Sequence, residues 1–274
     1  MRALAPSTEF DGRGIGTVVA SSFSSSHAAG WRPVAMCGRG GTAEVWLARA
    51  HDGREAALKR LQPALRQHPA ARERLRSEFA LLRAVASSGV VTPLELIEYD
   101  DGPALALEYL PNGDLVSLVG APPRYWLAAL GAVLAALDDL HSHGVAHGDL
   151  KARNVLFARD LSVRLVDLTS ARPVDGPAAR STAAYSLPRG VAGTARVADC
   201  FALAVLLYEL ATGRLPYGAE GATCLGYILP AAPRDPLAAR LAAAAEPMLT
   251  AGGGLSEGLS YFTDVIESVG AQGA

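Results

Sequence analysis

The sequence predicts an α+β fold with two lobes: an N-terminal lobe made of a five-stranded antiparallel sheet with one helix, and a mainly helical C-terminal lobe. Three observations lead to this prediction. Short apolar runs separated by turn residues fill most of residues 31–110, a pattern typical of strands joined by hairpins. Within this region, residues 69–86 instead repeat apolar side chains every three or four positions, which indicates a helix. Beyond residue 110, longer apolar stretches with helical periodicity dominate.

The first 30 residues differ from the rest of the chain. They are rich in Ser, Gly and Ala without sustained apolar periodicity, so we expect residues 1–30 to form a flexible arm. The segment Gly12–Gly16 superficially looks like a phosphate-binding loop, but no strand pattern precedes it, and we assign it no site. We then expect an N-terminal lobe at 31–110 and a C-terminal lobe at 111–274.

The N-terminal lobe is built from five expected strands and one helix. The strands are expected at 34–37, 43–49, 54–61, 94–99 and 104–110. Asp52-Gly53 and Asp101-Gly102 supply hairpin turns, because Asp-Gly tolerates the positive φ angles that such turns need. In the helix at 69–86, Glu78 lies beside the apolar stripe and should therefore face inward.

Four helices are expected in the C-terminal lobe, at 126–143, 197–211, 237–249 and 256–269. The stretch 197–211 is apolar nearly all round, which is typical of a helix buried within a lobe. Charged residues flank its most apolar part, so we interpret it as a core helix and not as a membrane span.

Composition narrows the classes of function. A formal net charge of −2 gives no electrostatic reason to expect nucleic acid or an anionic membrane as a partner. Three scattered Cys residues without a CxxC pair argue against a disulfide framework or a zinc site. The N-terminus shows no signal-peptide pattern, and we expect a cytoplasmic protein.

The segment His147–Asn154 is the most informative part of the sequence. Asp149 can accept a hydroxyl proton, Lys151 can neutralise a transferring phosphoryl group, and the amide oxygen of Asn154 can hold a magnesium ion that bridges phosphates. An Asp, a Lys two residues later and an Asn five residues later therefore predict phosphoryl transfer.

This segment resembles the catalytic loop of protein kinases, His-Arg-Asp-x-x-x-x-Asn, with Gly148 in place of the Arg. Together with the order of the elements, it makes residues 31 to about 270 resemble the eukaryotic-type (Hanks-type) serine/threonine protein kinases, as a divergent, bacterial-like member. The resemblance implies the bilobal protein-kinase-like fold and the use of ATP and Mg²⁺. It also implies a protein substrate with a Ser or Thr acceptor, the chain itself included.

The resemblance implies a nucleotide site that begins in the first strands. The glycine-rich loop corresponds to Gly38, Gly40 and Gly41, whose backbone N–H groups would approach the phosphates. Lys59 is the expected partner of the α- and β-phosphates, and Glu78, 19 residues later, would orient it as an ion pair. An inward-facing Glu needs such a partner, because an unpaired buried carboxylate is costly.

Residues after the first helix complete the implied nucleotide site. Glu108 and Leu110 correspond to the hinge, whose backbone would pair with adenine, while Leu107 would guard the back of the pocket. The residues implied to enclose the base are Val45, Ala57 and Leu156.

Asp167, 18 residues after Asp149, ends a stretch that resembles the strand leading into Asp-Phe-Gly, with Leu168 and Thr169 replacing Phe and Gly. The resemblance makes Asp167 the principal magnesium ligand beside Asn154, and both offer the hard oxygen atoms that magnesium prefers. We hypothesise that Thr169 restricts inversion of this loop.

Further downstream, Ser181–Arg189 resembles the Thr-x-x-Tyr-x-x-Pro-Glu segment that positions a peptide substrate, with Thr182 at the catalytic site and Arg189 in place of the Glu. Asp199 resembles the Asp that braces the catalytic loop. We interpret His147 as a core histidine.

Three functions remain open. An active serine/threonine protein kinase is favoured, because the residues with direct chemistry are all retained. A kinase-like small-molecule phosphotransferase is the first alternative, since His-Gly-Asp is a common variant of the loop in such enzymes. An ATP-binding pseudokinase that acts as a regulatory module is the second, given Ala43, Leu168, Thr169 and Arg189. In the favoured reading, Gly148 removes the Arg that would bind an activation-segment phosphate, so we predict activity that does not depend on phosphorylation there.

Overall fold

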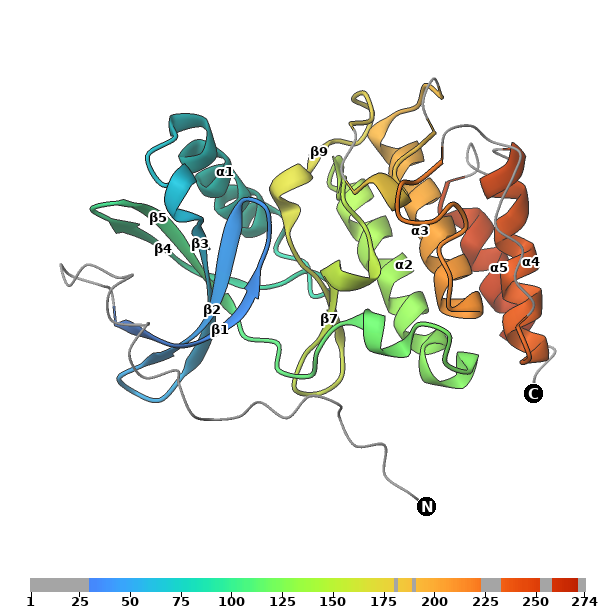
Figure 1. Ribbon diagram of the computed structural model, residues 1–274, viewed down its shortest axis with the longest axis horizontal. Coiled ribbons are helices and arrows are strands. Elements are labelled where there is room, and N and C mark those ends of the chain that lie inside the picture. Colours follow the sequence, from blue (N-terminus) through green and yellow to red (C-terminus); the bar gives the residue numbers. More distant parts are fainter. Residues whose placement is uncertain (1–29, 180–181, 189–190, 223–232, 252–257, 271–274) are drawn as a thin grey trace, which may run out of the picture. The chain divides into compact units, whose positions relative to one another are not determined.

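The computed structural model describes residues 30–179, 182–188, 191–222, 233–251 and 258–270 (Figure 1). The expected N-terminal arm, the segment Gly12–Gly16 and Arg189 lie outside these residues. By their contacts, the residues divide into two compact units, Met1–Glu73 with Leu94–Leu107, and Arg74–Pro93 with Glu108–Ala274.

The first unit carries the predicted five-stranded sheet, with strand order β1-β2-β3-β5-β4 (Figure 1). The strands are β1 (Trp31–Arg39), β2 (Ala43–Ala50), β3 (Glu55–Leu61), β4 (Pro93–Tyr99) and β5 (Gly102–Glu108). Both β1 and β3 pair with β2 in the antiparallel direction. The chain turns as the Asp-Gly pairs predict, with φ of +86° at Gly53 and +134° at Gly102.

Two strands, β1 and β5, differ from the expectation by two residues or more at their ends. β1 begins at Trp31, three residues early, because the indole is buried and its Nε1 donates to Glu95 over 3.0 Å. β5 runs from Gly102 to Glu108 and not from 104 to 110, because the turn is tight enough for Gly102 itself to start the strand.

The two faces of this sheet carry different residues. Successive side chains of a strand alternate between the faces, and Trp46, Ala48, Ala56 and Leu58 all belong to one buried apolar cluster. Val45 pairs directly with Lys59 and lies on the opposite face, together with Ala57. The residues expected to contact nucleotide in β2 and β3 therefore share the face that does not hold this cluster.

The helix α1 (Pro69–Val85) follows β3. It starts with Pro69, whose fixed φ suits the first helical position, and it ends before Ala86, which has a φ of +47°. Leu75, Glu78 and Leu82 are buried, and the inward orientation expected for Glu78 is confirmed by an exposed fraction of 2%. Most of α1 belongs to the second unit.

The second unit holds the predicted helices α2 (Leu127–Ser142), α3 (Ala195–Thr212), α4 (Pro236–Ala251) and α5 (Ser260–Gly270), of which α3 and α4 pack side by side (Figure 1). The helix α3 is buried along most of its length, as its apolar composition predicts. It ends at Gly213, which adopts the left-handed conformation common after helices. Among the described helices, none combines the length and hydropathy needed to cross a membrane.

Two small antiparallel pairs of strands position the loops of the second unit. β6 (Val145–Ala146) pairs with β9 (Arg172–Pro173), and β7 (Val155–Phe157) pairs with β8 (Val163–Leu165). The segment from His147 to Asn154 thus connects β6 to β7, and the segment 166–171 connects β8 to β9. The pairing of β6 with β9 and of β7 with β8 therefore holds the start of each connection beside the end of the other.

Candidate active site

The connection between β6 and β7 is anchored by His147, which is completely buried. One ring nitrogen, Nδ1, accepts a hydrogen bond from the backbone N–H of Asp149 at 3.2 Å. The other, Nε2, lies 3.1 Å from the backbone oxygen of Val166. A neutral imidazole has one donor and one acceptor, and the protein backbone satisfies both. The interpretation of His147 as a core residue is therefore confirmed.

The carboxylate of Asp199 on α3 also holds this connection in place. Its carboxylate accepts hydrogen bonds from the backbone N–H groups of His147 at 2.7 Å and Gly148 at 2.9 Å. Nε2 of His141 on α2 lies 2.9 Å from the same carboxylate. A buried carboxylate requires such partners, so α2 and α3 together fix the start of the loop. The sequence indicated Asp199 but not His141, which stands within an apolar helix pattern.

Asp149 lies at the centre of a hydrogen-bonded cluster. Its Oδ2 accepts from Nζ of Lys151 at 2.6 Å and its Oδ1 from the hydroxyl of Thr182 at 2.7 Å. Nζ of Lys151 also donates to the Thr182 hydroxyl over 2.8 Å. Burial favours the neutral carboxyl, but the hydrogen bonds from Lys151 and Thr182 and the charge of Lys151 outweigh it and lower the pKa of Asp149. The structure brings together the three residues that the sequence proposed as catalytic.

Asn154, at the end of the short turn Ala152–Asn154, faces the same carboxyl group. Its amide nitrogen donates to the backbone oxygen of Asp149 at 2.8 Å, and the Asn154 side chain is buried. Because the nitrogen is engaged there, the amide oxygen is the atom that remains for a cation.

Asp167 stands just after β8 in the left-handed conformation, with φ and ψ both 65°. With Asn154 it offers one carboxylate and one amide oxygen, a donor set that suits Mg²⁺, which keeps several waters and binds phosphate oxygens. Among the described residues, no cluster of three or more His, Cys, Asp or Glu side chains could hold a metal ion by itself. The residues fit magnesium bound together with a nucleotide.

Thr169 makes contacts that the sequence did not suggest. Its hydroxyl lies 2.6 Å from Oδ1 of Asp167 and 3.0 Å from Oε2 of Glu78. The only sequence signal was the departure from Gly at this position, which pointed to altered flexibility and gave no partner.

Gly148 is explained by its neighbours. Its φ is +79°, and a Cβ atom there would lie 2.4 Å from the backbone oxygen of Ser170, closer than non-bonded atoms approach. The same oxygen accepts hydrogen bonds from Nε and Nη2 of Arg172 at 3.1 and 3.0 Å. The residue that replaces the family's Arg therefore makes room for the backbone that follows Asp167.

The glycine-rich loop of the first unit shows a different pattern. Gly38, Gly40 and Gly41 do not adopt the left-handed conformation. A Cβ atom would meet nothing within 4 Å at Gly38 and Gly41, and at Gly40 it would make an ordinary van der Waals contact of 3.8 Å. The described chain thus gives no packing reason for glycine here, whereas a ligand that approaches the backbone closely would give one. Lys59, on β3, is buried with 8% of its surface exposed.

The remaining residues expected at the nucleotide belong to the second unit. Glu108 accepts a hydrogen bond from the N–H of Thr92 at 3.3 Å and lies 3.4 Å from Nε of Arg164. The N–H of Glu108 itself donates to the oxygen of Thr92 at 2.8 Å, so it is already engaged. Leu110 is buried, and Leu156 in β7 is half-buried.

The segment after Thr182 is tied to α3 by a polar contact. The hydroxyl of Tyr185 donates a hydrogen bond to the carboxylate of Glu209. Burial raises the pKa of Tyr185 and also that of Glu209. This contact links the segment that resembles the substrate-positioning segment to the core helix α3. Ser181 and Arg189 lie outside the described residues.

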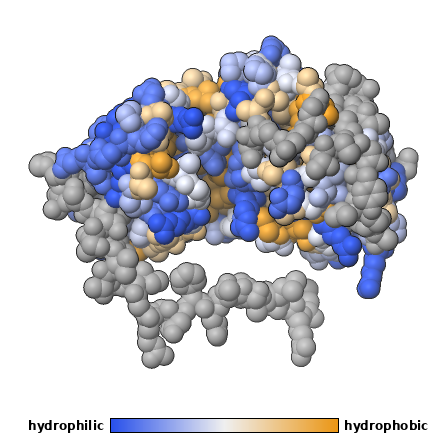
Figure 2. Space-filling model, turned by 45° about the horizontal axis from the view of Figure 1, so that its top comes forward, coloured by the Kyte–Doolittle hydropathy of each residue, from blue (hydrophilic) through white to orange (hydrophobic). Residues whose placement is uncertain are grey.

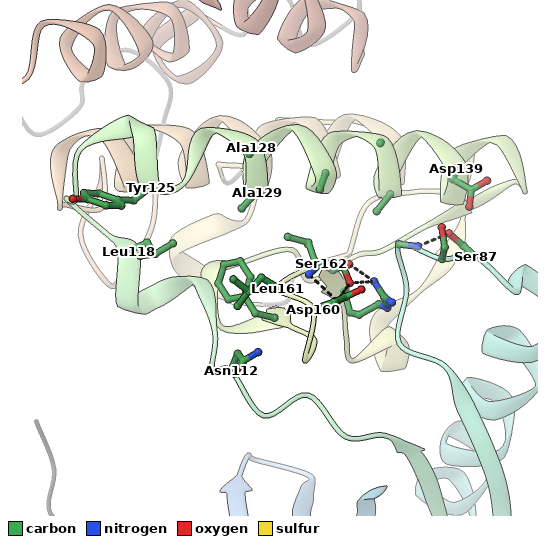
Figure 3. Close-up of a pocket in the computed structure, with 18 of the residues that line it drawn as sticks. Ser87, Asn112, Leu118, Tyr125, Ala128, Ala129, Asp139, Asp160, Leu161 and Ser162 are labelled. Carbon is green, nitrogen blue, oxygen red and sulfur yellow. Dashed lines mark hydrogen bonds between the residues drawn. The ribbon is translucent and has the colours of Figure 1, made fainter. Parts of the chain in front are cut away.

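A cavity of about 1070 Å³ lies within the second unit, apart from these residues (Figure 3). Small side chains of α2, among them Ala128 and Ala129, form one wall, and Leu161 from the turn between β7 and β8 lies opposite. Figure 2 shows hydrophobic patches within a mainly hydrophilic surface, and the exposed large apolar side chains include Tyr125 and Leu161. The lining does not include Asp149, Asn154 or Asp167. The cavity is thus separate from the candidate catalytic residues.

Comparison with known proteins agrees with the cluster around Asp149. A family model described as the protein kinase domain matches residues 31–227. The chain belongs to the protein kinase family. The recognition of this family and of its α+β fold from the sequence is therefore confirmed.

The kinase domain is similar to bacterial serine/threonine-protein kinases. It is 30% identical to Pkn1 of Myxococcus xanthus over 210 residues. The matched region covers 70% of this chain and 30% of Pkn1. It is 32% identical to PknH of Mycobacterium tuberculosis over 206 residues. This matched region covers 69% of this chain and 32% of PknH. The chain spans about a third of the length of these relatives. Membership of the protein kinase family implies the use of ATP and Mg²⁺.

Proposed function

We propose that this kinase domain is an active, ATP-dependent serine/threonine kinase that transfers the γ-phosphoryl group to Ser or Thr hydroxyls of protein substrates. The observation that carries the proposal is the cluster in which Asp149 is held by Lys151, Asn154 and Thr182. Positioned groups of this kind are what phosphoryl transfer requires, because the protein contributes orientation and charge stabilisation and little covalent chemistry.

Asp149 is proposed to orient the acceptor hydroxyl. Its lowered pKa keeps it ionised at neutral pH, so it can always accept a hydrogen bond from the acceptor. A carboxylate with a lowered pKa is a weak base. It therefore takes the proton late, when the acceptor oxygen has lost electron density to phosphorus.

Lys151 and Thr182 are proposed to place the phosphoryl group and the acceptor. Nζ of Lys151 lies beside Oδ2 of Asp149, where its charge can stabilise negative charge on the group being transferred. The hydroxyl of Thr182 donates a hydrogen bond to Oδ1 of Asp149, and the hydroxyl of a Ser or Thr acceptor is proposed to bind Asp149 in the same way. This arrangement favours a small aliphatic hydroxyl as acceptor.

Asn154 and Asp167 are proposed to hold magnesium, which would neutralise phosphate charge when bound. In the first unit, Gly38, Gly40, Gly41 and Lys59 are proposed to receive the phosphates. Val45 and Ala57 from that unit and Leu156 from the second are proposed to contact the base. Because the N–H of Glu108 is engaged by Thr92, its carbonyl and the N–H of Leu110 are the hinge groups proposed for adenine.

The test is incubation of the purified chain with Mg²⁺ and γ-labelled ATP, with and without a generic protein acceptor, beside the Asp149→Asn variant. We expect phosphoserine or phosphothreonine in the wild type and a large loss in the variant. A wild type that binds ATP but labels neither itself nor the acceptor would contradict the proposal. Transfer to a small hydroxylated compound in that case would establish the small-molecule phosphotransferase instead.

A further inference from the structure

The hydroxyl of Thr169 stands between two carboxylates of the second unit. Oδ1 of Asp167 is 2.6 Å away and Oε2 of Glu78 is 3.0 Å away. Asp167 is the proposed magnesium ligand, and Glu78 belongs to α1, where it is buried to 2% exposure. One side chain therefore contacts both the proposed metal position and the helix that precedes β4.

We propose that Thr169 is a positioning residue that couples magnesium-nucleotide binding at Asp167 to the stability of α1 through Glu78. The proposal uses the ligand of the proposed function but not phosphoryl transfer itself.

The Thr169 hydroxyl has one proton for two nearby carboxyl groups. A Thr hydroxyl has a single donor hydrogen, so at any time it is directed mainly at one of these two carboxyl groups. The shorter distance makes Asp167 the acceptor in the ligand-free chain. The longer contact, to Glu78, is then the weaker of the two hydrogen bonds.

A cation changes this balance. When Asp167 donates electron density to a metal, its carboxylate becomes a poorer hydrogen-bond acceptor. The hydroxyl of Thr169 can then rotate and donate to Glu78, which lies within hydrogen-bonding distance already. The strengthened hydrogen bond to the buried carboxyl group stabilises the turn of α1 that carries Glu78.

The backbone around Thr169 is fixed well enough to carry such coupling. Leu168 is buried to 2% exposure, and the oxygen of Ser170 is held by Arg172 and packed against Gly148. The hydroxyl hydrogen can therefore reorient by rotation about the Cβ–Oγ bond while the backbone of this turn keeps its place. A glycine, which the family pattern has at this position, would offer no hydroxyl.

Thr169→Val is the central variant, because it keeps the β-branched shape and removes the hydroxyl. Thr169→Ser keeps the hydroxyl, and Thr263→Val is a matched control whose hydroxyl bonds to Leu259 within its own region. Thermal unfolding without ligand establishes that each variant is folded.

The readout is amide hydrogen exchange of α1 residues 75–82 in the presence of a non-hydrolysable ATP analogue, with and without Mg²⁺. One hydrogen bond corresponds to roughly threefold to tenfold in an equilibrium constant. We expect Mg²⁺ to slow exchange by about this factor in the wild type, Thr169→Ser and Thr263→Val. In Thr169→Val the Mg²⁺ effect should fall to within about twofold of none.

Coupling is reciprocal, so calorimetric titration should show Mg²⁺ binding to the nucleotide complex weakened by the same factor in Thr169→Val alone. Equal Mg²⁺ protection of α1 in the wild type and Thr169→Val would overturn the proposal, and so would protection lost in Thr169→Ser. Neither measurement needs phosphoryl transfer. A wild type that is inactive yet shows the coupling would refute the proposed activity and support the role of Thr169.

Discussion

Two connections of the second unit carry the proposed chemistry, and they are held in different ways. The connection from His147 to Asn154 keeps the family's chemical residues. It is fixed by hydrogen bonds that its backbone N–H groups donate to Asp199 and His147, and by the contact of His147 Nε2 with the backbone oxygen of Val166. The connection that follows Asp167 departs from the family at Leu168 and Thr169 and is fixed by side chains of other elements, Glu78 and Arg172.

The departures in the two connections belong together. Gly148 leaves the space that the oxygen of Ser170 occupies, and Arg172 donates to that same oxygen. The family pattern has a positive charge at position 148, whereas this chain has Arg172 on β9, whose guanidinium donates to the backbone oxygen of Ser170. The comparison indicates that the second connection is held in place by the unmodified chain.

The largest expected effect is at the connection from His147 to Asn154, which keeps the chemical residues of the family pattern. We predict that Asp149→Asn lowers turnover by about 10²–10⁴-fold, because a positioned proton acceptor contributes this much. Binding of a non-hydrolysable ATP analogue should change by less than about twofold, since Asp149 acts on the acceptor. Steady-state kinetics and calorimetry measure the two quantities. An active Asp149→Asn variant would contradict the role assigned to this residue.

The next largest effect is expected where Gly148 of the first connection packs against Ser170 of the second. Gly148→Ala should unfold several degrees lower than the wild type and lose activity, since its Cβ must displace the backbone of Ser170. Gly144→Ala is the matched control: its φ of +75° is nearly the same, but a Cβ there meets nothing within 4 Å.

Both variants share the strain of a positive φ, roughly 1–2 kcal/mol. The additional loss in Gly148→Ala, read from thermal unfolding, measures the contact between the connections. Equal losses in the two variants would show that this contact does not determine the residue at 148.

A smaller effect concerns the segment after Thr182. Tyr185→Phe removes the hydrogen bond to Glu209, and we predict a loss of about 1–3 kcal/mol of stability, because a half-buried carboxyl group loses a hydrogen-bond donor. Chemical denaturation of the variant measures the loss. Unchanged stability would mean that solvent replaces the tyrosine hydroxyl.

The pH dependence of stability should change when Glu209 is replaced. Burial raises the pKa of this carboxyl in the folded chain, so the folded state is relatively favoured below the ordinary Glu pKa of about 4.3 and loses that advantage as pH rises through the raised value. Glu209→Gln should therefore flatten the fall of the unfolding midpoint with rising pH above about 4. An identical pH profile in the variant would contradict the raised pKa.

The sequence predicted the fold because its signals are local. Apolar periodicity located the strands and helices to within a few residues, and Asp-Gly pairs located the two hairpin turns. The inward orientation of Glu78 followed from the spacing of its neighbours on α1. The cluster around Asp149 could be predicted in part, since Asp149, Lys151 and Asn154 lie within six residues of one another.

Contacts between distant segments could not be predicted in the same way. The packing of Ser170 on Gly148 and the hydrogen bond from Tyr185 to Glu209 depend on where loops meet in space. Thr169 was visible in the sequence only as a missing glycine, and its contact with Glu78 spans 91 positions. No periodicity or motif reports such pairs, because each residue alone is compatible with an ordinary loop.

The most direct test of the account is the time course of phosphate transfer by protein that has first been treated with a phosphatase and separated from it. The account holds that the connection after Asp167 is positioned by Gly148, Thr169 and Arg172 without phosphate. It predicts that transfer from γ-labelled ATP to a protein acceptor is linear from the first time point. A lag that shortens as the chain phosphorylates itself, or activity that never returns, would contradict it.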